Sequence, residues 1–198
     1  MLFLFIASKA IFCYARVMKI YVIRHGQTEL NKANLINGFI DSTLTQEGLE
    51  QARLAALGLP ESIKRIYSSS LMRARQTTEI LNKELGLTVT FHDELKEVNF
   101  GDLEGTAFLD KYKERHKSLD YDWRPSGEHV EEVKKRVLTI LQRIFAENGE
   151  GEVLIVSHGG IIRMLNFLEF GTLMNEIPNT SIHSYNLETI LNRNRSAL

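Results

Sequence analysis

Short apolar runs alternate along this chain with longer segments in which apolar residues recur every three or four positions. The short runs predict strands at 20–23, 63–67, 88–91, 153–157 and 182–187. The periodic segments predict helices that follow Thr45, the serines at 68–70, Ser126 and Gly160. Because strands alternate with helices, the predicted fold class is α/β: a three-layer sandwich with a mostly parallel central sheet and helices on both faces.

The segments between these elements support less specific predictions. Residues 28–43 form a polar loop, and residues 101–127 lack a clean period, which indicates a lid or a loosely helical insertion. The charged run at 111–117 within that insertion is interpreted as a solvated face. Ser126 is expected to cap a helix over about 128–147, which we assign to the core and to no chemistry. The polar tail from Asn192 is expected to fray.

Residues 1–17 do not fit the pattern that follows them. Their first apolar stretch is too short to span a bilayer, and Lys9 and Arg16 interrupt the longer one. A secretory signal or anchor needs positive charge before its apolar region. In this chain only the amino terminus supplies positive charge there. We favour the alternative, an upstream extension with the natural start at Met18. The expected organisation is an extension at 1–17 and a single domain at 18–198.

The overall composition excludes several classes of protein. The 198 residues include 24 Lys and Arg against 25 Asp and Glu, so the formal charge is −1 and no global field favours nucleic acid or an anionic membrane. No stable membrane association is expected. The one cysteine, Cys13, rules out a disulfide within the chain and a zinc site built from cysteines. A reducing, cytoplasmic location is the default, and homodimer formation is left open.

Two of the predicted strands end in the same way. The first strand is followed by Arg24-His25-Gly26 and the fourth by His158-Gly159. Ligands of α/β sheets bind at the carboxyl ends of the strands. If these strands are parallel neighbours, both histidines face one crevice, and each glycine lets the backbone come close to what binds there.

The first turn of the helix after 68–70 contains Arg73 and Arg75, although the helix dipole disfavours cations there. A bound anion would make this placement of the two cations favourable. The plainer interpretation is that both arginines are solvated. Arg24 and Arg73, with two histidines and exposed backbone N–H groups, form a pocket suited to a compact dianion such as a phosphoryl group. A metal site is the rival interpretation, but neighbouring arginines would repel a cation, so no metal or other cofactor is expected.

Five motifs follow one another between Lys19 and about Leu187. They are Arg24-His25-Gly26-Gln27-Thr28 with Asn31, Ser42-Thr43-Leu44-Thr45 with Gly48, the run from Ser69 to Thr77, the run from Leu95 to Gly105, and Ser157-His158-Gly159-Gly160. In these motifs and their order the chain resembles the histidine phosphatase superfamily, also called the phosphoglycerate mutase-like family. It departs from the family at Gln27, where many members have Glu, and at His129, where many have Ser.

The resemblance implies a metal-independent mechanism and a role for each matched residue. His25 would be the nucleophile that forms a phosphohistidine, with its other ring nitrogen donating to a backbone carbonyl. Glu97 would be the general acid for the leaving group and then the base that activates water. Arg24, Arg73 and His158 would hold the non-bridging oxygens. The expected substrate-binding residues are Asn31, Gly26, Thr43 and Gly159.

Three functions are consistent with these residues. The one we favour is a phosphomonoester hydrolase, of the small phosphatase branch, that acts on a small phosphorylated metabolite. The second is a mutase of the phosphoglycerate mutase type, although mutases of this family usually carry longer insertions. The third is a non-catalytic phosphate-binding regulatory protein, against which Glu97 argues because binding alone would not need it. The compact size and the residues around Glu97 resemble broad-specificity and α-ribazole-phosphate-type phosphatases.

Overall fold

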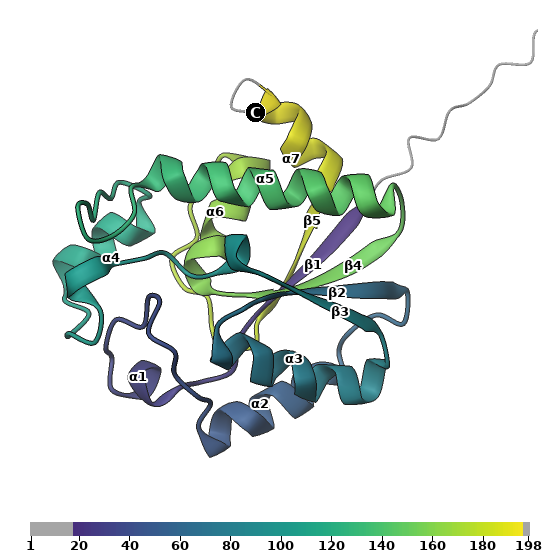
Figure 1. Cartoon of the computed structure of the whole chain (residues 1–198), viewed down its shortest axis with the longest axis horizontal. Coiled ribbons are helices and arrows are strands. Elements are labelled where there is room, and N and C mark those ends of the chain that lie inside the picture. Colours follow the sequence, from purple (N-terminus) through teal and green to yellow (C-terminus); the bar gives the residue numbers. More distant parts are fainter. Residues whose placement is uncertain (1–17, 196–198) are drawn as a thin grey trace, which may run out of the picture.

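A five-stranded sheet forms the centre of the computed structural model, which describes residues 18–195 (Figure 1). The expected extension at 1–17 lies outside the described residues. The strands are β1 (Lys19–Arg24), β2 (Ile63–Ser69), β3 (Thr88–His92), β4 (Glu152–Ser157) and β5 (Ile182–Asn186). Their order is β3-β2-β4-β1-β5, and only the β1–β5 pair in this sheet is antiparallel. The predicted mostly parallel sheet is therefore confirmed.

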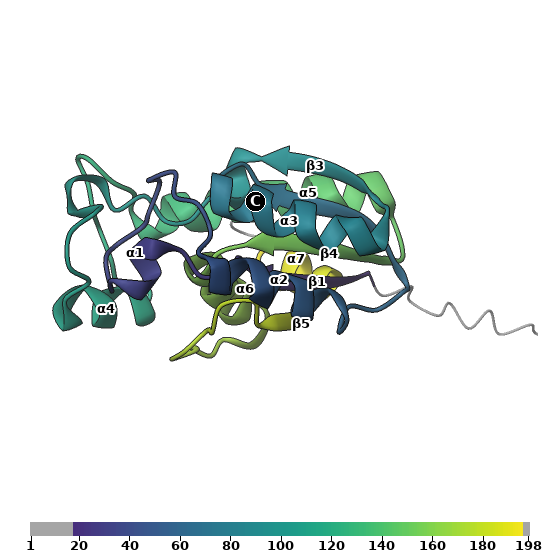
Figure 2. The same cartoon turned by 90° about the horizontal axis from the view of Figure 1, so that it is seen from below.

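Helices cover both faces of the sheet, as predicted (Figures 1 and 2). One face carries α2 (Gln46–Ala56) and α3 (Met72–Leu85), and the other carries α5 (Val130–Asn148), α6 (Gly159–Phe170) and α7 (Leu187–Arg193). The short helices α1 (Glu29–Lys32) and α4 (Asp110–Lys117) lie beyond the end of the sheet at which β1 ends (Figure 1). Two 3-10 turns, η1 (Asp93–Leu95) and η2 (Gly101–Leu103), connect β3 to the α4 segment.

Alternation along β4 explains why the protein has a core on each side of the sheet. Val153 and Ile155 pack into the core under α5 and α6, whereas Leu154 and Val156 pack into the core under α2 and α3. Successive side chains of a strand point to opposite faces, so a strand buried on both sides is apolar throughout. Each such side chain contributes about 1.5–3 kcal/mol through its burial. This double burial is what makes the strand at 153–157 recognisable from sequence.

The pairing of β1 with β4 determines the position of the polar residues that follow them. The strands are parallel, with Arg24 opposite Ser157, and the backbone N–H of His25 donates to the Ser157 carbonyl at 3.0 Å. The two strands therefore end side by side, and His25 and His158 emerge at the same edge of the sheet. The structure thus confirms that these strands are parallel neighbours.

The predicted cap of α5 is wrong. The helix begins after His129, whose Nδ1 accepts from the N–H of Glu131 at 3.1 Å while its own N–H donates to Glu132 at 2.7 Å. Ser126 lies earlier, and its Oγ accepts from the N–H of Asp102. The backbone of 126–128 is held against the turn at 99–102, so the helix starts only after this contact.

The serines at 68–70 do not cap α3. Ser68 and Ser69 complete β2, and the N-cap position is Leu71, which makes no side-chain capping bond. The polar loop at 28–43 contains α1, capped by Thr28 with Asn31. The charged run at 111–117 is α4 and is mainly solvated, except that His116 is buried. The last strand ends at Asn186, because Leu187 begins α7.

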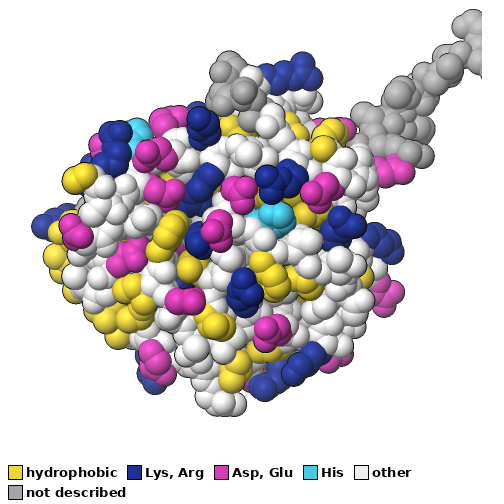
Figure 3. Space-filling view, in the orientation of Figure 1, with side chains coloured by type: hydrophobic (Ala, Val, Ile, Leu, Met, Phe, Trp, Pro, Cys, Tyr) yellow, Lys and Arg dark blue, Asp and Glu magenta, His cyan; other side chains and the backbone are white. Residues whose placement is uncertain are grey.

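The face of the molecule in Figure 3 carries charges of both signs, and the formal net charge of the chain is −1. Figure 3 shows Lys and Arg side chains interspersed with Asp and Glu over the face that it displays. Within the described part of the chain, no helix has both the length and the apolar character needed to cross a bilayer. Attraction for an anion must therefore arise locally, at the ends of the strands.

The loop after β1 touches the start of α2 backbone to backbone. A Cβ added to Gly48 would lie 2.2 Å from the carbonyl oxygen of Gln27, and one added to Gly26 would lie 2.4 Å from that of Gly48. These contacts leave no room for a side chain and fix the backbone just beyond His25.

We predict that Gly48→Ala lowers the free energy of unfolding by about 1–3 kcal/mol, because the backbone around Gln27 must move to admit a methyl group. Gly58→Ala is the matched control, since its Cβ would meet nothing closer than 3.7 Å. It should leave stability unchanged or raise it slightly. Urea unfolding of both variants measures the difference, and equal stabilities would show that the loop and α2 adapt freely.

Candidate active site

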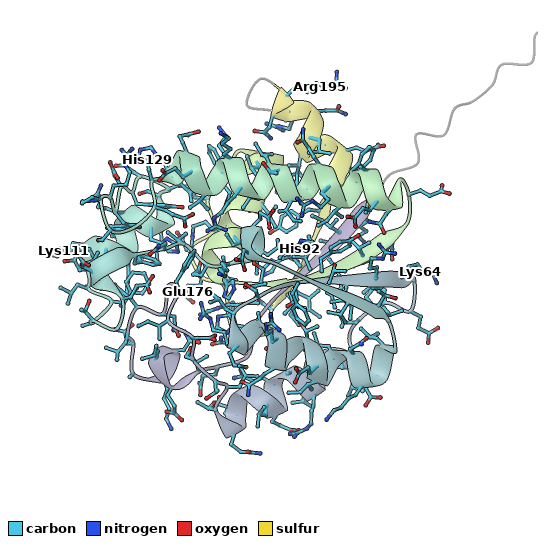
Figure 4. The ribbon with its side chains drawn as sticks, viewed as in Figure 1. Lys64, His92, Lys111, His129, Glu176 and Arg195 are labelled. Atoms are coloured by element: carbon cyan, nitrogen blue, oxygen red, sulfur yellow. The ribbon has the colours of Figure 1, made fainter. Side chains whose placement is uncertain are left out.

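Two adjoining cavities lie where β1 and β4 end. The inner cavity has a volume of about 250 Å³ and is lined by His25 and Arg73, and the outer cavity has a volume of about 610 Å³. Arg24 and Glu97 line both, so they stand at the boundary. Figure 4 labels Glu176, which lines the outer cavity. The structure thus brings together the five predicted catalytic residues, with His158 directly behind His25.

His25 is held as a neutral imidazole of one tautomer. Its Nδ1 lies 2.7 Å from the carbonyl oxygen of Gly26, an acceptor that requires the proton on Nδ1. Nε2 therefore carries the lone pair, and it accepts from Nε of Arg73 at 3.2 Å. Burial, followed by the charges of Arg73 and Arg24, lowers the pKa of His25 well below its ordinary value of 6.5. The predicted contact of the second ring nitrogen with a backbone carbonyl is present.

Arg73 is the most deeply placed cation of the site. It is fully buried, and its two terminal nitrogens donate to the carbonyls of Ile40 at 2.9 Å and Gly38 at 2.7 Å. Burial lowers the pKa of Arg73 to about 10, which leaves the side chain charged at neutral pH. Its neighbour Arg75 points elsewhere, with Nε donating to Ser70 and the guanidinium 4.4 Å from the ring of Phe91. Of the two first-turn arginines, only Arg73 lines the inner cavity.

Arg24 connects the pocket to the segment between α6 and β5. One of its terminal nitrogens donates to the carbonyl of Ile177, while its Nε is buried without a hydrogen-bond partner among residues 18–195. Burial is also the main cause that lowers the pKa of Arg24. A buried, unpartnered N–H of a cation at a cavity wall is suited to an incoming oxyanion.

His158 is fully buried next to His25, although it lines neither cavity itself. The centres of the His25 and His158 rings are 5.0 Å apart, and Nε2 of His158 lies 2.8 Å from the Ser69 hydroxyl. Its Nδ1 is buried with no partner in the part of the chain that the structure describes. Burial and the charge of Arg73 lower the pKa of His158 well below 6.5. Two neutral imidazoles and two guanidiniums therefore meet at one place, which favours a compact dianion.

The carboxylate of Glu97 lies at the N-terminus of α6. It accepts from the N–H of Gly160 at 3.1 and 3.2 Å and from the N–H of Val98 at 2.9 Å. A Cβ on residue 160 would lie 2.3 Å from Oε1 of Glu97, so only glycine allows this contact. The helix N-terminus thereby orients the carboxylate toward the boundary of the two cavities.

A mostly buried ion pair between Arg136 on α5 and Glu128, which precedes this helix, holds the backbone that carries Glu97. The guanidinium of Arg136 pairs with Glu128 at 2.8 Å and donates to the carbonyls of Glu94, Lys96 and Glu97, each at 2.8 Å. Both side chains of the pair are mostly buried, where a guanidinium that meets several acceptors gives a rigid arrangement. The helix thus belongs to the core, as expected, and it also supports the backbone on which Glu97 lies.

The four predicted substrate-binding residues differ in their positions relative to the two cavities. Asn31 lines the inner cavity and Gly159 the outer one. Gly26 lies beneath the pocket, where its N–H donates to Thr77. Thr43 is exposed and lines neither cavity. A binding role for these residues stays a prediction, and the geometry favours it for Asn31 and Gly159.

Three residues that sequence reasoning missed also line the cavities. Asn179 reaches the inner cavity and donates to the carbonyl of His25 at 3.0 Å. Arg163 lines the outer cavity and donates to the carbonyls of Met174 and Asn175. His116 lines both cavities. Of these three residues, only Arg163 could have been found from the sequence, because it is a cation within an otherwise apolar stretch of helix.

The sequence also leaves a metal site as the rival interpretation of these residues. Among residues 18–195, no group of three or more His, Cys, Asp or Glu side chains is arranged to hold a metal ion. Apart from the Glu97 carboxylate, the polar side chains that line the inner cavity are cations and neutral groups, which suits an anionic ligand.

The sequence profile of the histidine phosphatase superfamily (branch 1) matches residues 20–194. The chain belongs to the histidine phosphatase superfamily. The matched range includes both strand ends, Arg73 and Glu97, and it also spans the α4 segment.

Relatives in the histidine phosphatase superfamily carry different names. A putative phosphoserine phosphatase 2 from Hydrogenobacter thermophilus is 33% identical over 156 residues, covering 74% of this chain and 76% of that protein. Phosphoglycerate mutase-like protein 4 of Arabidopsis thaliana is 32% identical over 182 residues, covering 85% and 79%. The structure of a mycobacterial glucosyl-3-phosphoglycerate phosphatase with VO3 matches with a TM-score of 0.76 and 26% identity, covering 86% of this chain and 90% of that one. A phosphoglycerate mutase from Thermus thermophilus matches with a TM-score of 0.68 and 32% identity, covering 84% and 92%.

Gly160→Ala should displace the Glu97 carboxylate, the free end of a flexible side chain, and should also press on the ring of His116, since its Cβ would lie 2.3 Å from Oε1 of Glu97 and 2.8 Å from Cε1 of His116. We expect a loss of about 10²-fold in turnover, the usual effect of misplacing a reacting group. Gly159→Ala should lose much less, since its Cβ would meet nothing closer than 3.7 Å. Steady-state kinetics on a phosphomonoester compare the two, and equal losses would contradict the prediction.

Buried histidines should make the protein sensitive to acid. Burial lowers the pKa of His116 to about 4, whereas the unfolded chain titrates near 6.5. The neutral form of His116 therefore makes its full contribution to the free energy of unfolding above pH 6.5. This contribution is lost as the pH falls toward 4. Between pH 7 and 5 the free energy of unfolding should fall by about 2 kcal/mol more in the native protein than in His116→Gln. Urea unfolding at both pH values measures this, and an equal fall in the two proteins would contradict it.

Proposed function

We propose that this protein is a phosphomonoester hydrolase that acts on a small phosphorylated metabolite through a phosphohistidine on His25. The observation that carries the proposal is the position of Glu97 at the boundary of the two cavities. The phosphoryl group would occupy the inner cavity and the rest of the substrate the outer one. The oxygen that joins them then lies at the boundary, within the space that Glu97 faces.

In the first step, Nε2 of His25 attacks phosphorus and the bond from phosphorus to the leaving oxygen breaks. The protonated carboxyl of Glu97 gives its proton to that oxygen, so an alcohol departs rather than an alkoxide. The hydrogen bond from Nδ1 to the Gly26 carbonyl keeps the nucleophile in the required tautomer. Arg24, Arg73 and His158 hold the non-bridging oxygens while charge develops on them.

In the second step, water attacks the phosphohistidine and the nitrogen–phosphorus bond breaks. Glu97, now a carboxylate, accepts one proton from this water and is ready for the next cycle. Inorganic phosphate leaves, and His25 returns to its neutral form. Each residue is thus restored, and the steps need no group that the described side chains do not supply.

A mutase is the second candidate, because relatives that are 32–35% identical carry that name. A mutase would return the phosphoryl group to a different oxygen of the bound product instead of passing it to water. Incubation with 3-phosphoglycerate, with and without 2,3-bisphosphoglycerate, separates the two. Release of inorganic phosphate supports the hydrolase, whereas isomerisation without release supports the mutase.

Glu97→Gln should impair the enzyme in a way that depends on the leaving group. An alkoxide needs a proton in the transition state, so phosphoryl transfer from an alkyl phosphate should slow by about 10²–10⁴-fold. A nitrophenolate leaves as a stable anion, so transfer from p-nitrophenyl phosphate should slow far less. Hydrolysis of the phosphoenzyme then becomes limiting because the base is missing. Rapid-mixing kinetics should show a burst of nitrophenol followed by slow turnover.

Asp102→Asn is the control for this variant, because Asp102 is exposed and lines neither cavity. It should behave like the native protein on both substrates. Equal, modest losses on both substrates in Glu97→Gln, with no burst, would show that Glu97 has a structural role only. The proposed acid would then have to be abandoned.

A further inference from the structure

His116 is a buried, titratable side chain that the proposed mechanism does not use. It lies on α4, and only 6% of it is exposed, whereas neighbours such as Lys111 and Glu114 are exposed. It lines both cavities together with Glu97 and Arg24. The Cβ position that Gly160 leaves free is 2.3 Å from Oε1 of Glu97 and 2.8 Å from Cε1 of His116, so the two side chains meet at this point.

The surroundings of His116 would suit an apolar side chain better than an imidazole. Its ring centre lies 5.2 Å from that of Phe100, 6.1 Å from that of Phe108 and 5.7 Å from that of Tyr121. Nδ1 is buried and has no hydrogen-bond partner within residues 18–195. An unsatisfied buried polar group costs about 1–3 kcal/mol, so such a group in a folded protein calls for an explanation.

A neutral imidazole presents one donor and one acceptor. Burial, with the charges of Arg163 and Arg24, keeps His116 neutral at physiological pH by lowering its pKa, despite the opposing effect of Glu97. An alcohol hydroxyl also offers one donor and can accept, so it can match either ring nitrogen. A carboxylate could pair only with the protonated ring nitrogen, and an ammonium group only with the other one. A hydroxyl group can therefore pair with whichever nitrogen faces the cavity, in either tautomer.

We propose that His116 recognises a hydroxyl group of the leaving alcohol on the carbon next to the ester carbon, so that the substrates are phosphomonoesters of alcohols that carry such a second hydroxyl. This inference rests on the proposed hydrolase function. The position follows from geometry, because His116 shares the boundary of the cavities with the acid that serves the ester oxygen. A hydroxyl on the adjoining carbon would lie beside His116 when the ester oxygen lies beside Glu97.

The test compares two substrates that differ in one hydroxyl group, 2-hydroxypropyl phosphate and propyl phosphate. The native protein should have a kcat/KM about tenfold higher for the first, the worth of one well-made hydrogen bond. His116→Phe keeps a ring of similar size but removes both polar atoms, so the two values should become equal. His116→Gln retains a donor and an acceptor and should keep part of the preference.

His92→Phe is the matched control, because His92 lies on β3 with its ring 5.7 Å from that of Tyr67 and lines neither cavity. It should keep the full preference. Circular dichroism of each variant shows whether it is folded. If His116→Phe does not fold, the test rests on the ratio of the two kcat/KM values in His116→Gln, compared with the same ratio in the native protein.

Two results would overturn the proposal: equal kcat/KM for both substrates in the native protein, or an undiminished preference in a folded His116 variant. Both leave the hydrolase function in place, because the substrates are still hydrolysed. If the native protein hydrolyses neither these esters nor p-nitrophenyl phosphate, the proposed function itself is wrong, and the role of His116 is overturned with it.

Discussion

The parallel pairing of β1 with β4 is the constraint on which the whole site depends. With Arg24 opposite Ser157, the residues that follow each strand leave the sheet together, and the rings of His25 and His158 come within 5.0 Å of each other. A slip of one residue would exchange the side chains of β4 between two cores that are packed by different residues, and it would break the hydrogen bond from His25 to Ser157. The packing of both cores therefore fixes the register, and with it the spacing of the polar groups.

The parts of the site that strand and helix patterns predict are attached to regular elements, whereas Glu97 lies in the loop after η1 and its role is predicted only from the family resemblance. His25 and His158 could be found because each follows a recognisable apolar strand, and parallel strands place their ends together. Arg73 could be found because a cation at the start of a helix is unfavourable without an anion. The sandwich architecture follows in the same way from the alternation of short apolar runs with periodic segments.

The remaining parts depend on contacts between segments that are distant in the chain. Arg136 reaches the loop of Glu97 from the middle of α5, and nothing in the apolar stripe of that helix indicates the contact. His116 is hidden in a charged run whose other members are mainly solvated, and only the folded α4 segment shows that it turns inward. The start of α5 was misjudged for the same reason, since a tertiary contact delays the helix to His129.

Glu97 is oriented by α5 and α6, while α4 supplies much of the outer wall, including Lys113 and Lys117. This separation has an evolutionary consequence. Substitutions on this eight-residue helix can change the wall of the outer cavity while the residues that orient Glu97 stay in place. Under the proposed function, descendants of one ancestor could thus diverge in substrate and keep the same reaction.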